Sequence, residues 1–279
     1  MMLVAGGTGR LGTLVVSQLV EKGFEVRVLT RDPARAAHLT GVATEIATGD
    51  VRDRASIERT MDQVRTVVSA VHGFAGPGHV TPASIDRDGN ANLVDSAAAA
   101  GADVVLMSVV GASADSPMEL FRAKHDAEEH LRTSGAPWTI VRSTAFVELW
   151  AEIMRKPIVF GRGDNPINFV SVHDVAAVVV RAAIDPNVRG QILEVGGPQN
   201  VTFNELAMLL QQARGTGGKI RHVPRSVLRA LAPFGRQPRA AITMDTADMR
   251  FDVTGRTDLP LTELGTALSR VASGPHPKA

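Results

Sequence analysis

VAGGTGRLG, residues 4–12, decides the fold of this chain. It follows the short apolar run Met2–Ala5 and precedes a segment whose apolar residues recur at helical spacing. Glycines at positions 6, 9 and 12 let the backbone turn sharply and approach an anion, because they carry no Cβ. The first turn of the following helix offers backbone N–H groups that attract negative charge. Strand, glycine loop and helix in this order predict a site for a dinucleotide pyrophosphate. The alternative is that the glycines only serve a tight turn and close helix packing.

Strand and helix patterns alternate from this stretch to about residue 143. The expected strands cover residues 2–5, 25–29, 44–47, 66–70, 103–107 and 138–142, and the expected helices cover 10–22, 33–39, 53–61, 82–100 and 117–134. Ser116 to Glu119 has the pattern of a capping box for the last of these helices. Strands joined by helices pair in parallel through right-handed crossovers. The sequence therefore predicts an α/β fold with a Rossmann-type doubly wound parallel sheet.

The alternation loosens toward the C-terminus. Short strands are expected at 157–160, 167–170 and 191–195, and helices near 175–184 and 202–214. We therefore expect a dinucleotide-binding core at 1–150, a substrate-capping region interwoven with it at 151–272, and a flexible tail at 273–279.

Composition narrows the class of protein. Of the 279 residues, 44% are hydrophobic, the formal net charge is +1 and cysteine is absent. A balanced charge gives no electrostatic basis for nucleic-acid binding. The lack of thiols excludes disulfides and thiolate metal sites, so we expect no metal centre. We also find no leader-like segment and no apolar run near the ~20 residues of a membrane span. We expect a cytoplasmic protein whose partner is a small-molecule substrate, with no membrane or nucleic-acid partner.

The residues after the second expected strand bear on the choice of dinucleotide. NAD-binding folds usually place an acid there, which binds the ribose 2′-hydroxyl. This chain instead has Thr30 and Arg31, with Arg10 inside the glycine loop. Guanidinium groups at this position favour a 2′-phosphate, so we expect NADP, with NAD the less favoured cofactor. Asp32 is the counterargument, but Asp32-Pro33 also matches an N-cap followed by proline at the first helical position.

Several stretches together resemble one known superfamily. They are GGTGRLG (6–12), LTRDPAR (29–35), RAKHDAEEHLRTSGAPWTIVRSTAF (122–146) and NFVSVHDVAAVV (168–179). As a set they resemble the atypical short-chain dehydrogenases/reductases, and within them the NmrA-like NAD(P)-binding group. That group includes quinone-reductase-like and isoflavone-reductase-like enzymes. The resemblance covers about residues 2 to 200.

The resemblance implies which residues contact the cofactor. In the family, the glycine loop holds the pyrophosphate, and residues at the ends of the later strands line the adenosine and the nicotinamide. The implied cofactor-binding residues are Gly6, Thr8, Gly9, Arg10, Leu11, Gly12, Thr30, Arg31, Asp50, Val51, Ala70, Val71, His72, Ser108, Lys124, Arg142, Ser143 and Thr144.

The chain departs from the family pattern at the proton donor. Standard members carry Tyr-x-x-x-Lys, in which the phenol exchanges the proton and the lysine binds the nicotinamide ribose. Lys124 matches the lysine, but Leu120 stands four residues earlier and the chain contains no tyrosine. The assisting serine is also missing, since Val109 and Val110 occupy the positions after Ser108. The standard proton relay is therefore absent.

Two residues remain as candidate catalytic groups. Lys124 could deliver a proton if burial lowered its pKa, or it could only anchor ribose hydroxyls. His72 opens a loop after the fourth expected strand and could act as an acid, or it could be an ordinary loop residue.

Two classes of function follow. The first is an NADPH-dependent oxidoreductase that passes hydride to a small planar carbonyl or quinone-like substrate, since such an acceptor can draw its proton from water. Five aromatic residues are candidates for its pocket: Phe74, Phe121, Phe146, Trp150 and Phe160. The second is a non-catalytic NAD(P)-sensing regulatory protein of the NmrA type. A lyase or isomerase using bound NAD is a narrower alternative, and a homodimer is left open.

Overall fold

The computed structural model describes residues 1–74, 80–254 and 259–273, and the chain divides into two compact units. Unit 1 holds residues 1–142 and 175–194, and unit 2 holds 143–174 and those from 195 onward. Of the tail expected at 273–279, all but Ser273 lies outside the described residues, as does part of the loop after His72.

Unit 1 is built on a seven-stranded sheet with the order β10-β6-β5-β4-β1-β2-β3. The strands are β1 Met2–Ala5, β2 Val26–Thr30, β3 Glu45–Thr48, β4 Thr66–Ser69, β5 Asp103–Val109, β6 Trp138–Ser143 and β10 Gln191–Val195. The pairs β1–β2, β2–β3, β1–β4 and β4–β5 are parallel. The Rossmann-type α/β fold expected from the sequence is confirmed.

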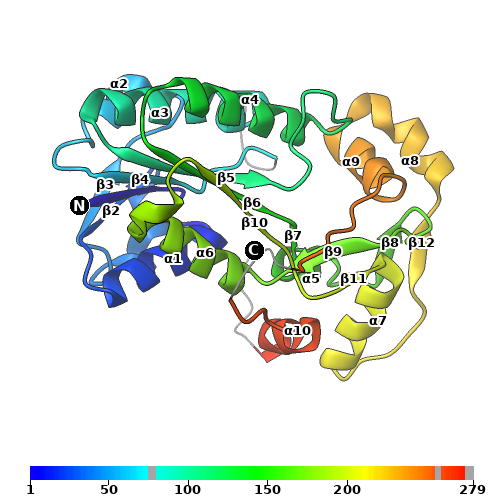
Figure 1. The fold of residues 1–279 in the computed structure, drawn as a ribbon. Helices are drawn as coiled ribbons and strands as arrows, with labels where there is room; N and C mark the ends of the chain where they lie inside the picture. Colours follow the sequence, from blue (N-terminus) through cyan, green and yellow to red (C-terminus); the bar gives the residue numbers. More distant parts are fainter. Residues whose placement is uncertain (75–79, 255–258, 274–279) are drawn as a thin grey trace. The chain divides into compact units, whose positions relative to one another are not determined.

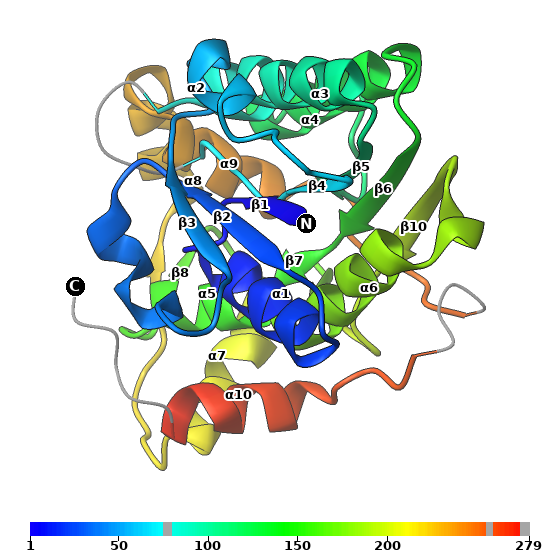
Figure 2. The ribbon, with the colours of Figure 1, turned by 90° about the vertical axis from the view of Figure 1, so that its left-hand side faces the viewer.

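Helices cover both faces of this sheet (Figure 1; Figure 2). One face carries α2 Arg54–Glu58, α3 Asp88–Ala100 and α4 Glu119–Thr133, and the other carries α1 Arg10–Glu21 and α6 Val172–Ile184. Short helical turns complete the unit: η1 Pro33–Leu39, η2 Pro82–Arg87 and η3 Pro186–Val188. Because both faces are covered, the strands read as nearly continuous apolar runs, and Leu3, Leu106 and Ile140 are fully buried.

The direction in which the sheet is built reverses between β1 and β4. From β1 the chain builds outward through β2 and β3, and from β4 it builds the other way through β5 and β6. In open α/β sheets, ligands bind at such a reversal, outside the carboxyl ends of the strands. Gly6 follows β1 and Ala70 follows β4, so the glycine loop lies at this point of the sheet.

Local capping explains one agreement and one error of the sequence-based prediction. Asp32 caps η1, because its carboxylate accepts a hydrogen bond from Ala34 N at 3.0 Å. The capping box expected at Ser116 to Glu119 is wrong. Helix α4 begins at Glu119 with Met118 as N-cap and no side-chain cap, while Ser116 Oγ accepts from Met118 N at 3.3 Å.

The helix expected at 82–100 is divided in the structure. A short π-helical segment, η2, runs into α3, and a capping box between Thr81 and Ser84 opens it. The wider turn of η2 brings Asp86 to a fully buried position.

Unit 2 has two small sheets and five α-helices among its described residues. One sheet has the order β11-β9-β7 and the other pairs β12 with β8. The elements are β7 Ala145–Phe146, α5 Val147–Ile153, β8 Ile158–Phe160, β9 Ile167–Val170, β11 Asn200–Val201, α7 Phe203–Ala213, β12 Arg221–Val223, α8 Arg225–Leu231, η4 Ala232–Phe234, α9 Arg236–Met244 and α10 Leu264–Ser273. Its core includes Trp150 and Phe203, whose ring centroids lie 4.7 Å apart.

Within the described parts of the chain, no helix combines the length and the apolar character needed to cross a membrane.

Candidate cofactor-binding site

Of the glycines at positions 6, 9 and 12, two are required by the fold itself. Gly6 has a φ of +82°, and a Cβ on it would lie 2.7 Å from Ala70 O at the end of β4. A Cβ on Gly12 would lie 2.1 Å from Gly6 O, where the first turn of α1 packs on the loop. Both positions exclude any larger residue, so turn geometry and helix packing explain these two glycines.

Gly9 has a different environment. It is the N-cap of α1 with a φ of −85°, and the nearest atom to a Cβ there would be Gly6 O at 3.2 Å. A shift of a few tenths of an ångström would relieve that contact. The first intrahelical hydrogen bond runs from Thr13 N to Gly9 O at 2.9 Å, so the amides of Leu11 and Gly12 precede it at the helix end. Gly9 has no side chain, and the free amides of the first turn of α1 lie beside it, so a phosphate could approach the backbone closely here.

Basic side chains lie at the ends of β2 and β3, where the 2′ group of a dinucleotide is expected. Arg31 and Arg10 are exposed, and Thr30 is buried with its hydroxyl donating to Asp32 O at 3.0 Å. Asp50 is paired with Arg52, whose Nη2 lies 2.6 Å from Oδ2. Arg52 was not among the predicted residues. It adds a third guanidinium to the same edge of the sheet.

The two acids at this edge, Asp50 and Asp32, each have a structural partner. The hydrogen bond from Arg52 holds the pKa of Asp50 below its ordinary value, and the charge of Arg31 acts in the same direction. Asp32 is engaged as the cap of η1. This supports the structural interpretation of Asp32, and the assignment of Arg31 to a 2′-phosphate stays a prediction.

The ends of β3 and β4 supply apolar and backbone groups. Val51 is buried, and its carbonyl accepts a hydrogen bond from Asn92 Nδ2 at 2.9 Å. Ala70 and Val71 are half-buried next to Gly6. These positions fit the adenosine contacts that the family resemblance implies.

Lys124 is buried, with 4% of its side chain exposed. Its Nζ donates to Met107 O at 2.8 Å and to Val71 O at 3.1 Å, and it lies 3.0 Å from Oδ1 of Asp86. Three acceptors therefore surround the ammonium group, which has three protons to give. This arrangement ties β4 and β5 to η2 through α4.

His72 comes immediately after Val71, and its side chain is exposed. Protein atoms nevertheless surround the ring closely enough that desolvation lowers its pKa from the ordinary value. The positive charge of Lys124 lowers it further, and the negative charge of Asp86 opposes both effects. The imidazole is therefore largely neutral near pH 7.

Ser108 and Arg142 converge on a buried carboxylate, Glu128 of α4. Ser108 Oγ donates to Oε1 at 2.5 Å, and Arg142 Nε donates to the same oxygen at 2.9 Å. Arg132 Nη2 reaches Oε2 at 2.9 Å. The hydrogen bonds that Arg142 donates to Glu128 raise the pKa of Arg142 above its ordinary value.

The last two predicted cofactor residues belong to unit 2. Ser143 is buried at the end of β6. Thr144 donates from its hydroxyl to Asn168 Oδ1 at 2.8 Å, and its amide donates to Val195 O at 3.1 Å. Their assignment to the nicotinamide remains a prediction.

The five aromatic candidates do not share one unit. Phe74 and Phe121 belong to unit 1, and Phe146, Trp150 and Phe160 belong to unit 2. Trp150 and Phe160 line an apolar hollow of about 20 Å³, which holds about one water molecule and not a ring. Trp150 is mainly a core residue through its contact with Phe203.

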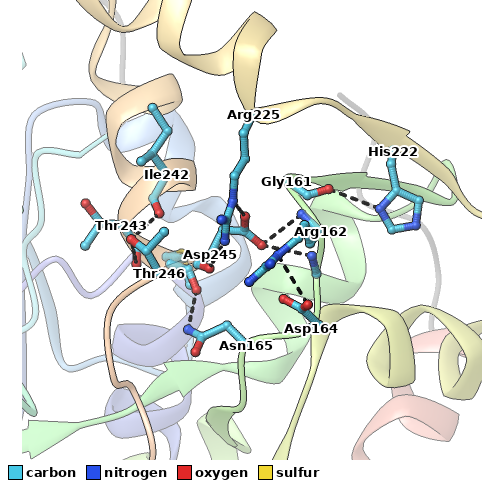
Figure 3. Close-up of polar contacts among 12 residues, drawn as sticks. Gly161, Arg162, Asp164, Asn165, His222, Arg225, Ile242, Thr243, Asp245 and Thr246 are labelled. Carbon is cyan, nitrogen blue, oxygen red and sulfur yellow. Dashed lines mark hydrogen bonds and ion pairs between the residues drawn. The ribbon is translucent and has the colours of Figure 1, made fainter.

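Unit 2 also contains a polar cavity of about 320 Å³ beside Asp245. Figure 3 shows the polar contacts of Asp245 and the residues around it. Asp245 accepts hydrogen bonds from the amides of Arg162 at 3.0 Å and Gly163 at 2.9 Å, and from Nε of Arg225. Burial opposes its ionisation, but these donors together hold its pKa below the ordinary value. Asp245 therefore fastens the loop after β8 to α8 and α9.

Two buried acids of unit 1 were missed by the sequence reasoning. Asp86 and Glu128 are both 0% exposed and each binds a predicted site residue. For Glu128 a signal was present, because it lies four residues after Lys124 and beside Ala127 on the face that also carries Leu131. A charged pair on the apolar face of a helix indicates a buried network.

Comparison with known proteins agrees with this geometry. A family model described as NAD(P)H-binding matches residues 6–186. An NAD(P)H azoreductase from Xenophilus azovorans is 32% identical over 222 residues, which are 77% of this chain and 74% of that protein. A (4-alkanoyl-5-oxo-2,5-dihydrofuran-3-yl)methyl phosphate reductase from Streptomyces griseus is 31% identical with the same coverage. The fold is shared with an NADPH-dependent quinone oxidoreductase from Escherichia coli, solved with NADPH, at a TM-score of 0.79 and 21% identity over 97% of this chain and 99% of that one.

Proposed function

This chain belongs to the NAD(P)H-binding family, and from that premise we propose that it is a reductase that takes hydride from NADPH. The acceptor is a small planar carbonyl or quinone-like molecule. Membership of the family confirms the resemblance to the NmrA-like group of atypical short-chain dehydrogenases/reductases. Two relatives above 30% identity are named as reductases, which supports the catalytic class.

One observation carries the proposal. The fold requires glycine at positions 6 and 12, but it leaves room for a small side chain at Gly9. Gly9 is the N-cap of α1, in the loop that follows β1, and β1 adjoins β4 where the building direction of the sheet reverses. A ligand that approaches the backbone explains the glycine, and a pyrophosphate matches the helix end.

The basic edge supports NADPH over NADH. Arg31 and Arg52 are placed after β2 and β3, and Asp32 is engaged in capping η1. A guanidinium group can form two hydrogen bonds to a phosphate, whereas a ribose hydroxyl gains much less from it.

The chemistry needs few groups from the protein. When bound, the cofactor supplies the hydride, and the glycine loop holds it through backbone amides. The reduced acceptor then needs a proton. His72 is the ionisable side chain that we assign to that step, and its lowered pKa means that its protonated fraction falls as pH rises through the mildly acidic range. A quinone-like acceptor can also take the proton from water, so activity does not depend wholly on His72.

The test follows NADPH absorbance with menadione, a quinone, and with 2-cyclohexen-1-one, an enone, as acceptors. We expect oxidation of NADPH with at least one of them, and NADPH to bind more tightly than NADH. Arg31→Ala should lower NADPH affinity about tenfold and leave NADH affinity nearly unchanged. Arg35→Ala, which removes an exposed charge from η1, is the matched control.

Each contrary outcome has a definite meaning. Tight NADPH binding with no oxidation by any acceptor would replace the reductase with a non-catalytic NAD(P) sensor. An Arg31→Ala variant that keeps the wild-type ratio of NADPH to NADH affinity would remove the 2′-phosphate assignment. Folded protein that binds neither nucleotide would overturn the whole proposal.

A further inference from the structure

Asp86 and Lys124 hold the backbone on both sides of His72. Lys124 Nζ donates to the carbonyl of Val71 at 3.1 Å, and Asp86 Oδ2 accepts from the amide of Gly73 at 2.7 Å. His72 lies between these two residues, and the two anchoring groups form an ion pair at 3.0 Å. The bonds therefore fix the peptide groups before and after His72 while its side chain remains exposed.

The anchor is itself rigidly placed. Asp86 is fully buried, and its own carbonyl accepts from Asn90 Nδ2 at 2.7 Å. Gly73 packs so closely on η2 that a Cβ there would lie 2.3 Å from Thr81 O. Gly73 is therefore held against the start of η2 by packing and by its hydrogen bond to Asp86.

Stability alone does not explain why this pair is charged. Burying a carboxylate and an ammonium costs desolvation free energy, and an apolar pair of similar size would avoid that cost. What an apolar pair could not supply is a donor for the Val71 carbonyl and an acceptor for the Gly73 amide. The polar groups are therefore matched to the segment that carries His72.

We infer that Asp86 and Lys124 are positioning residues that hold His72 at the carboxyl edge of β4, next to the glycine loop, where it contacts the cofactor and its acceptor. This inference rests on the proposed function. Lys124, which matches the lysine of the family pattern, is thereby given a backbone-anchoring role. Asp86 is given a role that no sequence motif indicated.

Another cluster in unit 1 provides a matched control. Arg27 is buried near the start of β2, where its Nη1 donates to Thr60 O at 2.6 Å and Asp62 O at 2.8 Å, and its Nη2 pairs with Glu45 at 2.7 Å. It has the same chemical pattern of a cation, two carbonyls and a carboxylate. It lies at the amino edge of the parallel strands, away from the glycine loop.

The kinetic test compares Asp86→Asn with Arg27→Met. We expect Asp86→Asn to lower kcat for menadione at least tenfold while KM for NADPH changes less than about threefold, because misplacing a group near the reacting atoms mainly affects kcat. Arg27→Met should leave kcat within about twofold at a similar loss of melting temperature. Equal losses of kcat in the two variants would make the Asp86–Lys124 pair a clamp of the fold alone.

A second readout does not depend on turnover. The His72 ring is titrated by NMR, with its signal among the eight histidines assigned by its absence in His72→Gln. Asp86 and Lys124 are the charged groups that act on His72, in opposite directions. Asp86→Asn should lower the pKa of His72, because it removes a negative charge, and Lys124→Met should raise it, because it removes a positive one.

Unchanged His72 titration in both variants would overturn the inference even if the reductase is active. Opposite shifts in a protein that oxidises no NADPH would keep the placement of His72 and reject the proposed function. If either single variant fails to fold, the double variant Asp86→Asn/Lys124→Met removes both charges together. The inference then requires that the segment around His72 be more mobile in the double variant. This would be measured as faster amide hydrogen exchange at Gly73 than in Arg27→Met.

Discussion

The two edges of the unit 1 sheet carry buried cations of similar chemistry in different settings. At the amino edge, Arg27 binds two carbonyls and Glu45, whose side chain is 46% exposed. At the carboxyl edge, Lys124 binds two carbonyls and Asp86, whose side chain is 0% exposed. The amino-edge cluster joins β2, β3 and the segment before β4, and all of its partners belong to the framework.

The carboxyl-edge cluster differs because it binds the backbone on both sides of His72, whose side chain is exposed. Its carbonyl and amide partners flank His72, and the glycine loop lies next to it at Gly6 and Ala70. In parallel sheets, ligands bind at the carboxyl ends, so this edge must hold its backbone without covering it. A buried ion pair can therefore hold a surface group through the main chain, whereas a similar cluster at the other end of the strands only joins strands.

The largest expected effect comes from Lys124→Met. It leaves the Asp86 carboxylate buried without a counter-charge, so we expect a loss of about 3–5 kcal/mol in the free energy of unfolding, measured by urea denaturation. The added change Asp86→Asn should restore part of that loss. A Lys124→Met variant as stable as the wild type would mean that the pair contributes nothing to the carboxyl edge.

Two glycine variants test the same carboxyl edge, and the expected loss in the free energy of unfolding is the next in size. Gly12→Ala forces a Cβ to 2.1 Å from Gly6 O and should cost about 3 kcal/mol of stability. Gly9→Ala meets only a contact at 3.2 Å, so it should fold nearly normally but weaken NADPH binding more than tenfold. Thermal melts and NADPH titration separate the two effects, and normal cofactor affinity in Gly9→Ala would contradict the assignment of the loop.

Arg27→Met probes the amino edge and should have a moderate effect. The variant loses two hydrogen bonds to carbonyls, but the Glu45 carboxylate is half exposed and can be hydrated. We expect a loss of about 2 kcal/mol, measured by urea denaturation, with NADPH affinity unchanged. A change in cofactor affinity would show that the two edges are coupled.

The smallest effect is expected from Asp50 and Arg52, an exposed pair at the carboxyl edge. The pKa of Asp50 is depressed by Arg52, so its contribution is present above the ordinary aspartate value of about 3.9 and is lost as pH falls through the lower folded value. Asp50→Asn should cost under about 1 kcal/mol at pH 7, and the cost should shrink as the pH is lowered. Calorimetric melts over that pH range measure this, and a difference that grows on acidification would give the opposite sign.

The parts of the molecule that follow local rules could be predicted from the sequence. The strands from β1 to β6, the start of α1 and the cap at Asp32 were expected, because apolar spacing, glycines and proline determine them within a few residues. The capping box at Ser116 failed because a loop hydrogen bond to Met118 competes for the same hydroxyl.

The partners of the site residues could not be predicted in this way. Lys124 binds the carbonyl of Val71, which lies 53 residues earlier in the chain. It also pairs with Asp86, which the π-helical segment η2 carries. Glu128 draws together Ser108 and Arg142 from two strands. Such contacts depend on how helices pack on the sheet, which residue spacing does not specify.

The distribution of aromatic residues has an optical consequence. The chain has two tryptophans and no tyrosine, with Trp138 opening β6 in unit 1 and Trp150 on α5 in unit 2. Each unit therefore carries one tryptophan, which dominates its intrinsic fluorescence. Replacing one of them by phenylalanine leaves a fluorescence signal that belongs to the other unit alone, so cooperative and stepwise melting of the two units can be distinguished without any attached dye.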